Sequence, residues 1–415
     1  MAQRFWIETL GCPKNQVDSD KLVGTLLADG MQPASTPETA DLVVVNTCAF
    51  IEEARQESID VVLALSDRRR EGAEVVVTGC LAERHGDELA AAIPEVSVRG
   101  FGVPVALGRG PRRNSFDLLN LPRPRSARPW AYVKIAEGCD RACGFCAIPT
   151  FRGKQRSRSL EAILDEVDQL DVREVVLVAQ DLASYGRDQG VGEKSIVPLV
   201  EAVAARVDWV RLLYLYPSEL NDKLIAAIGA TGVPYFDLSL QHVSAPLLRR
   251  MRRWGDGQRF LRRIADIRRR EPAAAFRTNF IVGYPGETEA DHDELLRFLD
   301  EAQLEWCGFF AYSPESGTYA EGLDGRVDKA LVRERLRELG ERQDAITAHA
   351  RDSLIGTTTR VLVDTAGVAR SHREAPEIDG VINVPTALQT GTFHTVKIVA
   401  ALGPDLEAQP VEDAR

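Results

Sequence analysis

Residues 137–146 read EGCDRACGFC, a run that places Cys139, Cys143 and Cys146 within eight residues. The run directly follows AYVKIA (131–136), an apolar segment with the composition of a β-strand. Three thiolates without a fourth ligand or a nearby histidine are typical of a four-iron cluster that keeps one iron open, whereas structural zinc sites usually take four ligands. This compact triple therefore predicts a redox centre at the end of a strand.

Further strand candidates follow the compact triple, each separated from the next by a helical stretch. They are 174–180, 209–217, 235–241, 276–283 and 306–313. With 131–136 they predict six β/α units, an incomplete form of the usual eight-unit barrel. Because barrel active sites lie at the carboxyl ends of the strands, the polar residues there become candidates: Gln180, Asp181, Gln241, His242, Arg277 and Asn279.

A second, dispersed triple precedes the barrel. The strand-like runs RFWIETLGC, DLVVVNTC and AEVVVTGC end in Cys12, Cys48 and Cys80, with helical stretches between them. Strand–helix–strand spacing predicts a parallel sheet, in which the carboxyl ends of all strands share one edge. We therefore expect the three cysteines to meet there and to hold a second cluster. The alternative is that each cysteine is a small buried apolar residue.

The remaining segments complete an α/β chain. A Pro- and Arg-rich linker precedes the barrel, a charged helix (328–353) follows it, and the last residues contain short β runs broken by Gly and Pro. We predict an N-terminal parallel α/β domain (1–108), a linker (109–130), a partial (β/α)6 barrel with its trailing helix (131–355), and a small antiparallel β-barrel (356–415).

Composition limits the class of protein. Hydrophobic residues make up 44% and charged residues 27%, which is an ordinary globular balance. No apolar run reaches the roughly 18 residues of a membrane span, and the N-terminus lacks the features of a signal peptide. We therefore expect a cytoplasmic protein without a membrane partner, in which clustered cysteines bind metal. The net charge of −11 favours a basic partner over RNA.

The compact triple resembles the cluster loop of radical S-adenosylmethionine enzymes. The runs LGCPKN, VNTC and TGCLAE resemble the N-terminal domain of methylthiotransferases within that superfamily, and LVAQDLASYG, LQH and FIVGYPGET resemble their radical domain. The resemblance implies two 4Fe-4S clusters, S-adenosylmethionine as cofactor, an electron donor protein as partner, and a TRAM-like barrel at the C-terminus. It also places Phe145 near the adenine of the cofactor.

Two branches of the family differ in substrate. One modifies tRNA adenosine, and the other adds a methylthio group to the β-carbon of an aspartate in small-subunit ribosomal protein twelve. GCPKN (11–15), VAQDLASYG (178–186) and RSHREAPEIDG (370–380) resemble the second branch. The last module carries 5 basic and 8 acidic residues, a balance of −3, which suits a basic substrate protein on the assembled or assembling subunit.

Other readings stay open. A tRNA methylthiotransferase is the alternative enzyme, and a non-catalytic iron–sulfur or zinc protein at the ribosome is a third class. Ser239 and Trp254 stand where the family usually has proline, and SPESGTYA (313–320) also departs from its pattern. These departures affect loop shape and remove no cysteine.

Individual side chains carry further predictions. Gln180, Asp181, Arg277 and Asn279 join Phe145 as candidate cofactor-binding residues, and each also fits an ordinary structural role. Gln241 and His242 are candidates for the barrel mouth, although a histidine after a strand is more often a structural hydrogen-bonding group. Three more residues complete the set: Lys14, which could hold an anionic sulfur species or be solvated, Thr288, expected to cap a helix, and Cys307, expected in the core.

Overall fold

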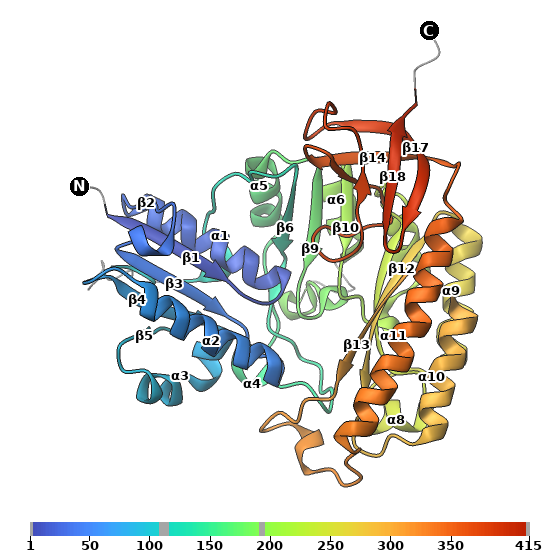
Figure 1. Ribbon diagram of the computed structural model, residues 1–415, viewed down its shortest axis with the longest axis horizontal. Helices are drawn as coiled ribbons and strands as arrows, with labels where there is room; N and C mark the ends of the chain where they lie inside the picture. The colour runs from blue at the N-terminus through green and yellow to red at the C-terminus, as the bar shows by residue number, and fades with distance from the viewer. Residues whose placement is uncertain (1–2, 108–115, 191–195, 412–415) are drawn as a thin grey trace.

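The computed structural model describes residues 3–107, 116–190 and 196–411. It contains an N-terminal α/β domain beside a larger barrel, with a small β-barrel seated on one end of the larger one (Figure 1). The predicted boundary at 108, the first part of the linker (109–115) and the acidic Glu412 and Asp413 lie outside the described residues. The residue at which each domain ends stays a prediction.

The N-terminal domain is the predicted parallel sheet, in the order β2-β1-β3-β4-β5. Its strands are β1 (Arg4–Thr9), β2 (Gln32–Pro33), β3 (Leu42–Thr47), β4 (Glu74–Gly79) and β5 (Ser97–Val98). Its helices are α1 (Pro13–Ala28), α2 (Glu52–Arg68) and α3 (Cys80–Ala92). Every residue of β3 is buried, as expected when helices cover both faces of a parallel sheet.

The barrel has the six predicted parallel strands. They form two sheets, β6-β9-β10 and β11-β12-β13, which a bridge between Leu215 and Leu238 connects. The strands are β6 (Trp130–Lys134), β9 (Glu174–Val178), β10 (Trp209–Leu212), β11 (Tyr235–Gln241), β12 (Ala275–Val282) and β13 (Trp306–Ala311). The prediction of an incomplete barrel is confirmed.

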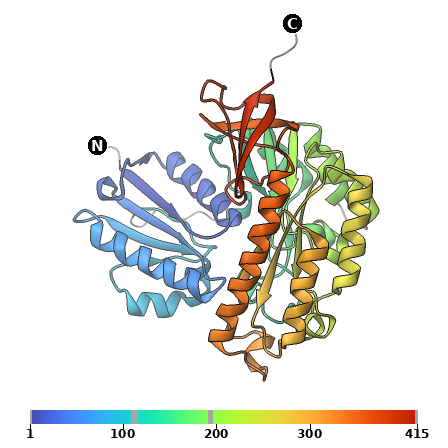
Figure 2. The same cartoon turned by 45° about the vertical axis from the view of Figure 1, so that its right-hand side comes forward.

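Helices follow these strands, and most of them cover the outside of the barrel, whereas the short helix Ile148–Arg152 packs against α3 of the N-terminal domain. The helices are α4 (Ile148–Arg152), α5 (Leu160–Leu170), α6 (Ile196–Ala204), α7 (Asp222–Gly229), α8 (Ala245–Arg250), α9 (Gly257–Arg270) and α10 (Glu289–Ala302). The trailing helix α11 (Lys329–Asp352) runs along the barrel beside α10 (Figure 2). None of the described helices is long and apolar enough to cross a membrane.

The C-terminal module closes into a five-stranded barrel, in the order β14-β15-β16-β18-β17. Its strands are β14 (Thr358–Thr365), β15 (Val368–Arg370), β16 (Ile382–Asn383), β17 (Phe393–Leu402) and β18 (Asp405–Pro410). The barrel is confirmed, but β16 and β18 pair in parallel. An odd number of strands cannot close with every neighbour antiparallel, so one parallel pair is required.

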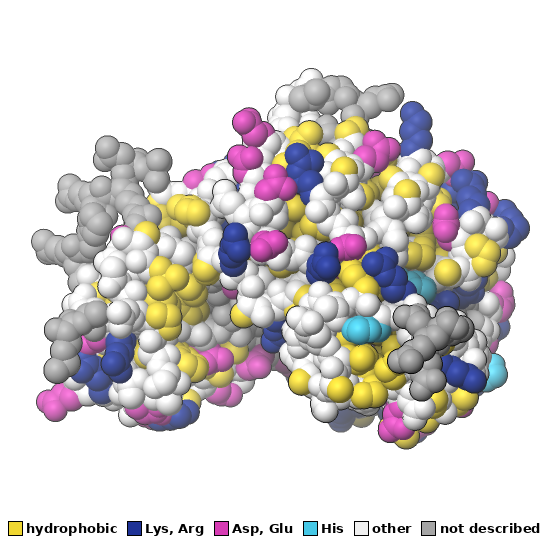
Figure 3. Space-filling view, turned by 90° about the horizontal axis from the view of Figure 1, so that it is seen from above, with side chains coloured by type: hydrophobic (Ala, Val, Ile, Leu, Met, Phe, Trp, Pro, Cys, Tyr) yellow, Lys and Arg dark blue, Asp and Glu magenta, His cyan; other side chains and the backbone are white. Residues whose placement is uncertain are grey.

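This module covers the amino ends of the larger barrel's strands. Aromatic residues that open those strands, among them Trp130, Trp209 and Trp306, pack in one buried cluster with Leu362 of β14. Glu174 at the start of β9 is fully buried and pairs with Arg211 and with Arg370 of the module. The compact triple follows β6 and so lies at the opposite, carboxyl end. Viewed from above, acidic and basic side chains are interspersed on the module's side (Figure 3).

Candidate functional site

The compact triple lies in a loop that the barrel fixes at both ends. Gly138 takes a φ of +78°, and a Cβ there would lie 2.2 Å from the Lys154 carbonyl oxygen, so the turn requires glycine. Arg141, inside the loop, donates from Nε to Asp181 Oδ2 at 2.6 Å and from Nη2 to Glu219 Oε1 at 3.2 Å. Its guanidinium also lies 3.9 Å from the ring centroid of Tyr216. The structure therefore places Asp181 where it anchors the cysteine loop through Arg141.

Burial makes two thiols of this loop, those of Cys139 and Cys146, reluctant to ionise. It raises the pKa of Cys139 to about 11 and that of Cys146 to about 12. From the other side of the loop, Arg253 Nη1 lies 3.4 Å from Cys143 Sγ. Buried thiolates need nearby cations to balance their negative charge, and the iron ions of a cluster provide that balance.

The dispersed triple converges on the carboxyl edge of the N-terminal sheet. Cys12 precedes α1, Cys48 follows β3, and Cys80 opens α3 directly after β4. A Cβ on Gly11 would lie 2.7 Å from Cys48 Cβ, so the segment carrying Cys12 packs directly on Cys48. Asn15 completes the edge, because its Nδ2 donates to the Thr47 carbonyl at 3.0 Å while its Oδ1 lies 3.8 Å from Cys80 Sγ. The structure brings the three cysteines together as expected.

The three thiols of this edge differ in their electrostatic surroundings. Burial raises the pKa of Cys48 to about 12 and also raises that of Cys80. Burial opposes ionisation of Cys12 too, but the cations of Lys14 and Arg152 outweigh it and hold the pKa of Cys12 below its ordinary value. Cys12 is therefore the thiol of this set that ionises most easily.

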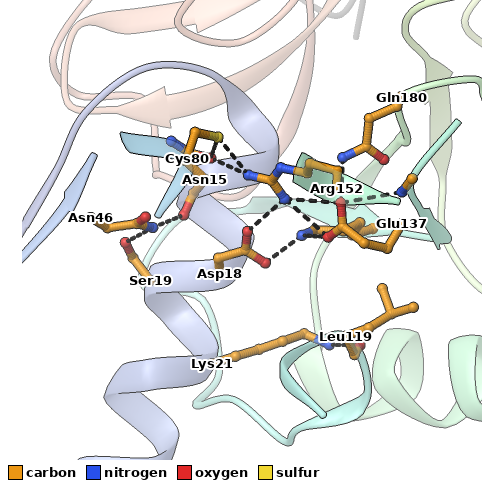
Figure 4. A network of polar contacts seen from close by, with 12 residues as sticks. Asn15, Asp18, Ser19, Lys21, Asn46, Cys80, Leu119, Glu137, Arg152 and Gln180 are labelled. Atoms are coloured by element: carbon orange, nitrogen blue, oxygen red, sulfur yellow. Dashed lines mark hydrogen bonds and ion pairs between the residues drawn. The ribbon is translucent and has the colours of Figure 1, made fainter. Parts of the chain in front are cut away.

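Arg152 reaches the dispersed triple at Cys80 (Figure 4). It ends α4, six residues after Cys146, and its side chain is almost fully buried. Its Nη2 lies 3.0 Å from Cys80 Sγ and donates to Asn15 Oδ1 at 2.9 Å. Its guanidinium also lies 4.2 Å from the ring centroid of Phe101. The helix that leaves the compact triple thus reaches a cysteine of the dispersed triple.

Two carboxylates hold this arginine in place. Arg152 Nη1 donates to the Glu137 oxygens at 2.9 and 3.0 Å and to Asp18 Oδ2 at 3.3 Å. Lys134 at the end of β6 pairs with both Asp18 and Glu137. Two cations and two carboxylates therefore form a balanced, buried group across the boundary between the N-terminal domain and the barrel (Figure 4).

The surroundings of the compact triple fit a polar ligand. Gln180 donates to Glu137, but its Oε1 atom is buried without a hydrogen-bond partner. Asp181 Oδ1 and Arg253 Nε are also buried without a hydrogen-bond partner among the described residues. S-adenosylmethionine carries an ammonium, a carboxylate and ribose hydroxyl groups, which match unpaired acceptors and donors of this kind. Phe145 packs partly buried against the barrel core beside them.

Arg277 and Asn279 are engaged elsewhere. Arg277 donates from Nη1 to Asp237 Oδ1 at 3.1 Å, and its Nε lies 3.5 Å from Asp379 of the C-terminal module. Asn279 Oδ1 lies 3.5 Å from Arg277 Nη2. The guanidinium is therefore already satisfied by carboxylates, and its partners tie the barrel to the module.

The other candidates have defined surroundings. Lys14 Nζ lies 3.5 Å from the ring centroid of Tyr214, so the side chain packs on the barrel and is not merely solvated. His242 is fully buried, and its Nδ1 accepts from the Ser244 N–H at 3.1 Å in a structural role. Thr288 caps α10 as expected. Two residues remain: Gln241 takes a left-handed φ of 70° at the end of β11, and Cys307 is half-buried on β13 against the core.

Sequence reasoning missed the charged residues of the site: Asp18, Lys134, Glu137, Arg141, Arg152 and Arg253. Three of them, Glu137, Arg141 and Arg152, lie within or beside the cysteine run, and their nearness to it was the available signal. Nothing in the sequence shows that a charged side chain is buried, so their pairing appears only in the folded chain.

The described residues hold no group of three His, Cys, Asp or Glu side chains arranged around a single metal ion. A four-iron cluster makes no such demand, because each cysteine binds a different iron atom. Three thiols spread over one sheet edge or one loop remain compatible with it.

Three family descriptions match successive parts of the chain. Residues 4–100 match the uncharacterized protein family UPF0004, residues 133–299 the radical SAM superfamily, and residues 355–411 the TRAM domain. The chain is similar to the ribosomal protein uS12 methylthiotransferase RimO of Aquifex aeolicus (strain VF5), with 40% identity over 99% of this chain and 98% of the relative. The protein of that name from Cutibacterium acnes is 39% identical over 97% of each chain.

Among solved structures, the cobalamin-dependent S-adenosylmethionine radical enzyme OxsB is similar over 82% of this chain and 56% of its own, with 11% identity and a TM-score of 0.49.

Proposed function

Because the chain belongs to the family of ribosomal protein uS12 methylthiotransferases, radical S-adenosylmethionine enzymes with 4Fe-4S clusters, we propose that its substrate is an aspartate of small-subunit ribosomal protein uS12. The product would carry a methylthio group on the β-carbon of that aspartate. The observation that carries the proposal is the 40% identity to a uS12 methylthiotransferase over 99% of this chain. The contact of Arg152 with Cys80 agrees with it, because it brings the loop of one cysteine triple to the other.

We assign the cluster ligands to the two triples. Cys12, Cys48 and Cys80 would hold one 4Fe-4S cluster, and Cys139, Cys143 and Cys146 the one that takes S-adenosylmethionine. Three protein ligands leave one iron of each cluster without a cysteine. When bound, these groups supply the one-electron chemistry that removes an unactivated hydrogen and the sulfur that replaces it.

The chain's own residues position these groups. Arg141, held by Asp181 and Glu219, fixes the path of the compact loop. The unpaired Gln180 Oε1 and Asp181 Oδ1 atoms are acceptors for the cofactor's ammonium or ribose hydroxyl groups. Phe145 would pack near the adenine. Arg277 and Asn279 complete the assignment, although Arg277 is engaged with Asp237 and Asp379, and Asn279 with Arg277.

The substrate and partners follow from this assignment. We infer that the chain works in the cytoplasm on ribosomal protein uS12, on the assembled or assembling small subunit, and takes electrons from a donor protein. The acidic C-terminal module covers the end of the barrel away from the compact triple. It would therefore attract a distant part of the basic substrate and leave the reacting aspartate at the cysteine loop.

The test is reconstitution with iron and sulfide under anaerobic conditions, then incubation with S-adenosylmethionine, a reductant and either uS12 or tRNA. Mass spectrometry should find the methylthio increment on an aspartate of uS12. Cys80→Ala should abolish it, whereas Cys307→Ala, which removes a cysteine outside both triples, should leave it intact. Modification of tRNA adenosine with unmodified uS12 would overturn the proposal in favour of the alternative enzyme.

A further inference from the structure

The segment 249–270 is strongly basic within an acidic chain. It contains ten arginines and two aspartates, a balance of +8, whereas the whole chain carries −11, so the remainder carries −19. Its helix α9 buries Gly257, Phe260, Ile264 and Ile267 against the barrel. In Figure 1, α9 lies at the outer edge of the barrel, on the side away from the N-terminal domain. The charge is therefore presented to solvent.

Five arginines form the outer face of this helix, which we call the α9 arginine face: Arg259, Arg262, Arg263, Arg269 and Arg270. They extend over roughly 16 Å of helix, at 1.5 Å per residue. The carboxylates that pair with them are Asp222, Asp256 and Asp266, which leaves two positive charges in excess. Exposed ion pairs of this kind are weak, so phosphate groups can replace them.

Arg262 strengthens the case for an external ligand. Its side chain is exposed, and within the part of the chain that the structure describes it has no ion pair or hydrogen-bond partner. Arg269, which shares Asp266 with Arg270, is 72% exposed. The Arg262 guanidinium is free to bind phosphate oxygens, and the exposed Arg269 can exchange its pair with Asp266 for a phosphate without a change in the helix.

A hollow of about 320 Å³ opens beside this face. Its floor is apolar and includes Leu220, Leu240 and Phe260, and its rim includes Trp254 and Arg262. The Trp254 ring is 42% exposed, with its centroid 6.2 Å from that of Phe260. An exposed aromatic ring beside a row of cations is the combination that binds single-stranded nucleic acid, with a base on the ring and phosphates on the cations.

The hollow borders the compact triple. The backbone N–H of Trp254 donates to the Tyr216 hydroxyl at 3.4 Å, and the neighbouring Arg253 packs on the Tyr216 ring while reaching Cys143 Sγ. A ligand on the α9 arginine face that reaches Trp254 therefore has one end next to the loop where we place the reaction.

The geometry points to Trp254 and the α9 arginine face as a docking surface for single-stranded RNA of the ribosomal particle. The inference rests on the proposed function, since a substrate held within the small subunit is surrounded by RNA. A basic protein segment would be repelled by this surface, and an acidic peptide would leave the Trp254 platform without a flat partner. This basic surface explains how an enzyme with a negative net charge can approach a particle rich in phosphate.

Binding of the full-length protein to a short fluorescein-labelled single-stranded RNA and to purified small subunits tests the inference. We expect R262E/R269E to weaken RNA binding at least tenfold. It should also make the slope of log K against log salt shallower by about 1.4, because each lost phosphate contact on a single strand contributes about 0.7. R262Q/R269Q should give a smaller effect in the same direction.

Two further variants separate base stacking on Trp254 and general charge effects from phosphate binding by the α9 arginine face. Trp254→Ala should lower affinity by about 5- to 150-fold, the range for loss of one stacked base, with the salt slope unchanged. The matched control R337E/R342E reverses two exposed arginines of α11 and should bind like the wild type. RNA affinity of R262E/R269E equal to that of the wild type, or lowered no more than in the control, would overturn the inference.

The proposed function is tested separately, because binding requires no catalysis. If the chain binds RNA through α9 but modifies tRNA, the docking surface is supported and the proposed substrate is wrong. If the chain modifies uS12 while its α9 variants bind RNA normally, the proposed substrate is supported and the docking surface is wrong.

Discussion

Replacing Arg152 by methionine tests the connection between the two cysteine triples. Methionine keeps an unbranched apolar stem but removes the contacts with Cys80, Asn15, Glu137 and Asp18. Lys134 then faces two buried carboxylates alone, so one negative charge is left unbalanced. Breaking a buried ion group in this way costs about 3–5 kcal/mol of unfolding free energy. Urea unfolding of the cluster-free protein measures this cost.

Arg152→Met should also change the cluster held by the dispersed triple. A cation that donates to a ligand sulfur stabilises the more negative, reduced cluster, so its loss lowers the reduction potential. We expect a decrease of about 60 mV or more, which corresponds to a tenfold change in the ratio of reduced to oxidised cluster. Redox titration followed by electron paramagnetic resonance measures it, in a background where Cys139, Cys143 and Cys146 are replaced by alanine.

Arg158→Met is the matched control. Arg158 is equally buried and pairs with Glu166, but none of its hydrogen-bond or ion-pair partners within the described residues is a cysteine. It should destabilise the fold and leave the potential unchanged. Equal shifts in the two variants, or no shift in Arg152→Met, would refute the assignment of Arg152 to the cluster.

Three other outcomes are expected. Cys80→Ala should lower iron in the reconstituted protein from about eight to about four per chain, while Cys307→Ala retains about eight; equal loss in both would remove the distinction between ligand and core cysteine. Glu174→Gln leaves the buried Arg211 and Arg370 without their shared carboxylate and should cost about 3–5 kcal/mol, seen in urea unfolding and in faster proteolysis of the C-terminal barrel. Burial lowers the pKa of His242 in the folded chain to about 4. As the pH falls, the unfolded chain, with an ordinary histidine pKa of about 6.5, therefore binds a proton before the folded chain does. Stability should then fall between about pH 6.5 and about pH 4, by at most about 3 kcal/mol, and less in His242→Gln, as urea midpoints across that range would show.

Much of the fold was predictable because it depends on local patterns. Apolar runs such as Leu42–Thr47 are strands that helices cover on both faces, and their spacing requires parallel crossovers. The cysteines that end β1, β3 and β4 had to share an edge once the sheet was parallel. Closure of the C-terminal barrel was predictable too, but its parallel β16–β18 pair required knowledge of the strand count and order.

Placement of side chains was less predictable. For Arg277 the sequence left cofactor binding and a structural pair both open, and it did not reveal that one partner is Asp379, from another domain. Lys14 was a candidate for holding an anionic sulfur species, with a solvated side chain as the alternative, and the structure packs it on Tyr214 from the barrel. In each case the partner lies far along the chain, so no local pattern reveals the contact.

The sequence alone determined the two cysteine triples, their positions at strand ends and the order of the three domains, because these follow from short-range periodicity and from the chemistry of thiolates. The tertiary structure decided how the triples relate to each other. Arg152 crosses from the barrel to Cys80 because two buried carboxylates and Lys134 balance its charge there, and that balance exists only when the N-terminal domain and the barrel are packed together.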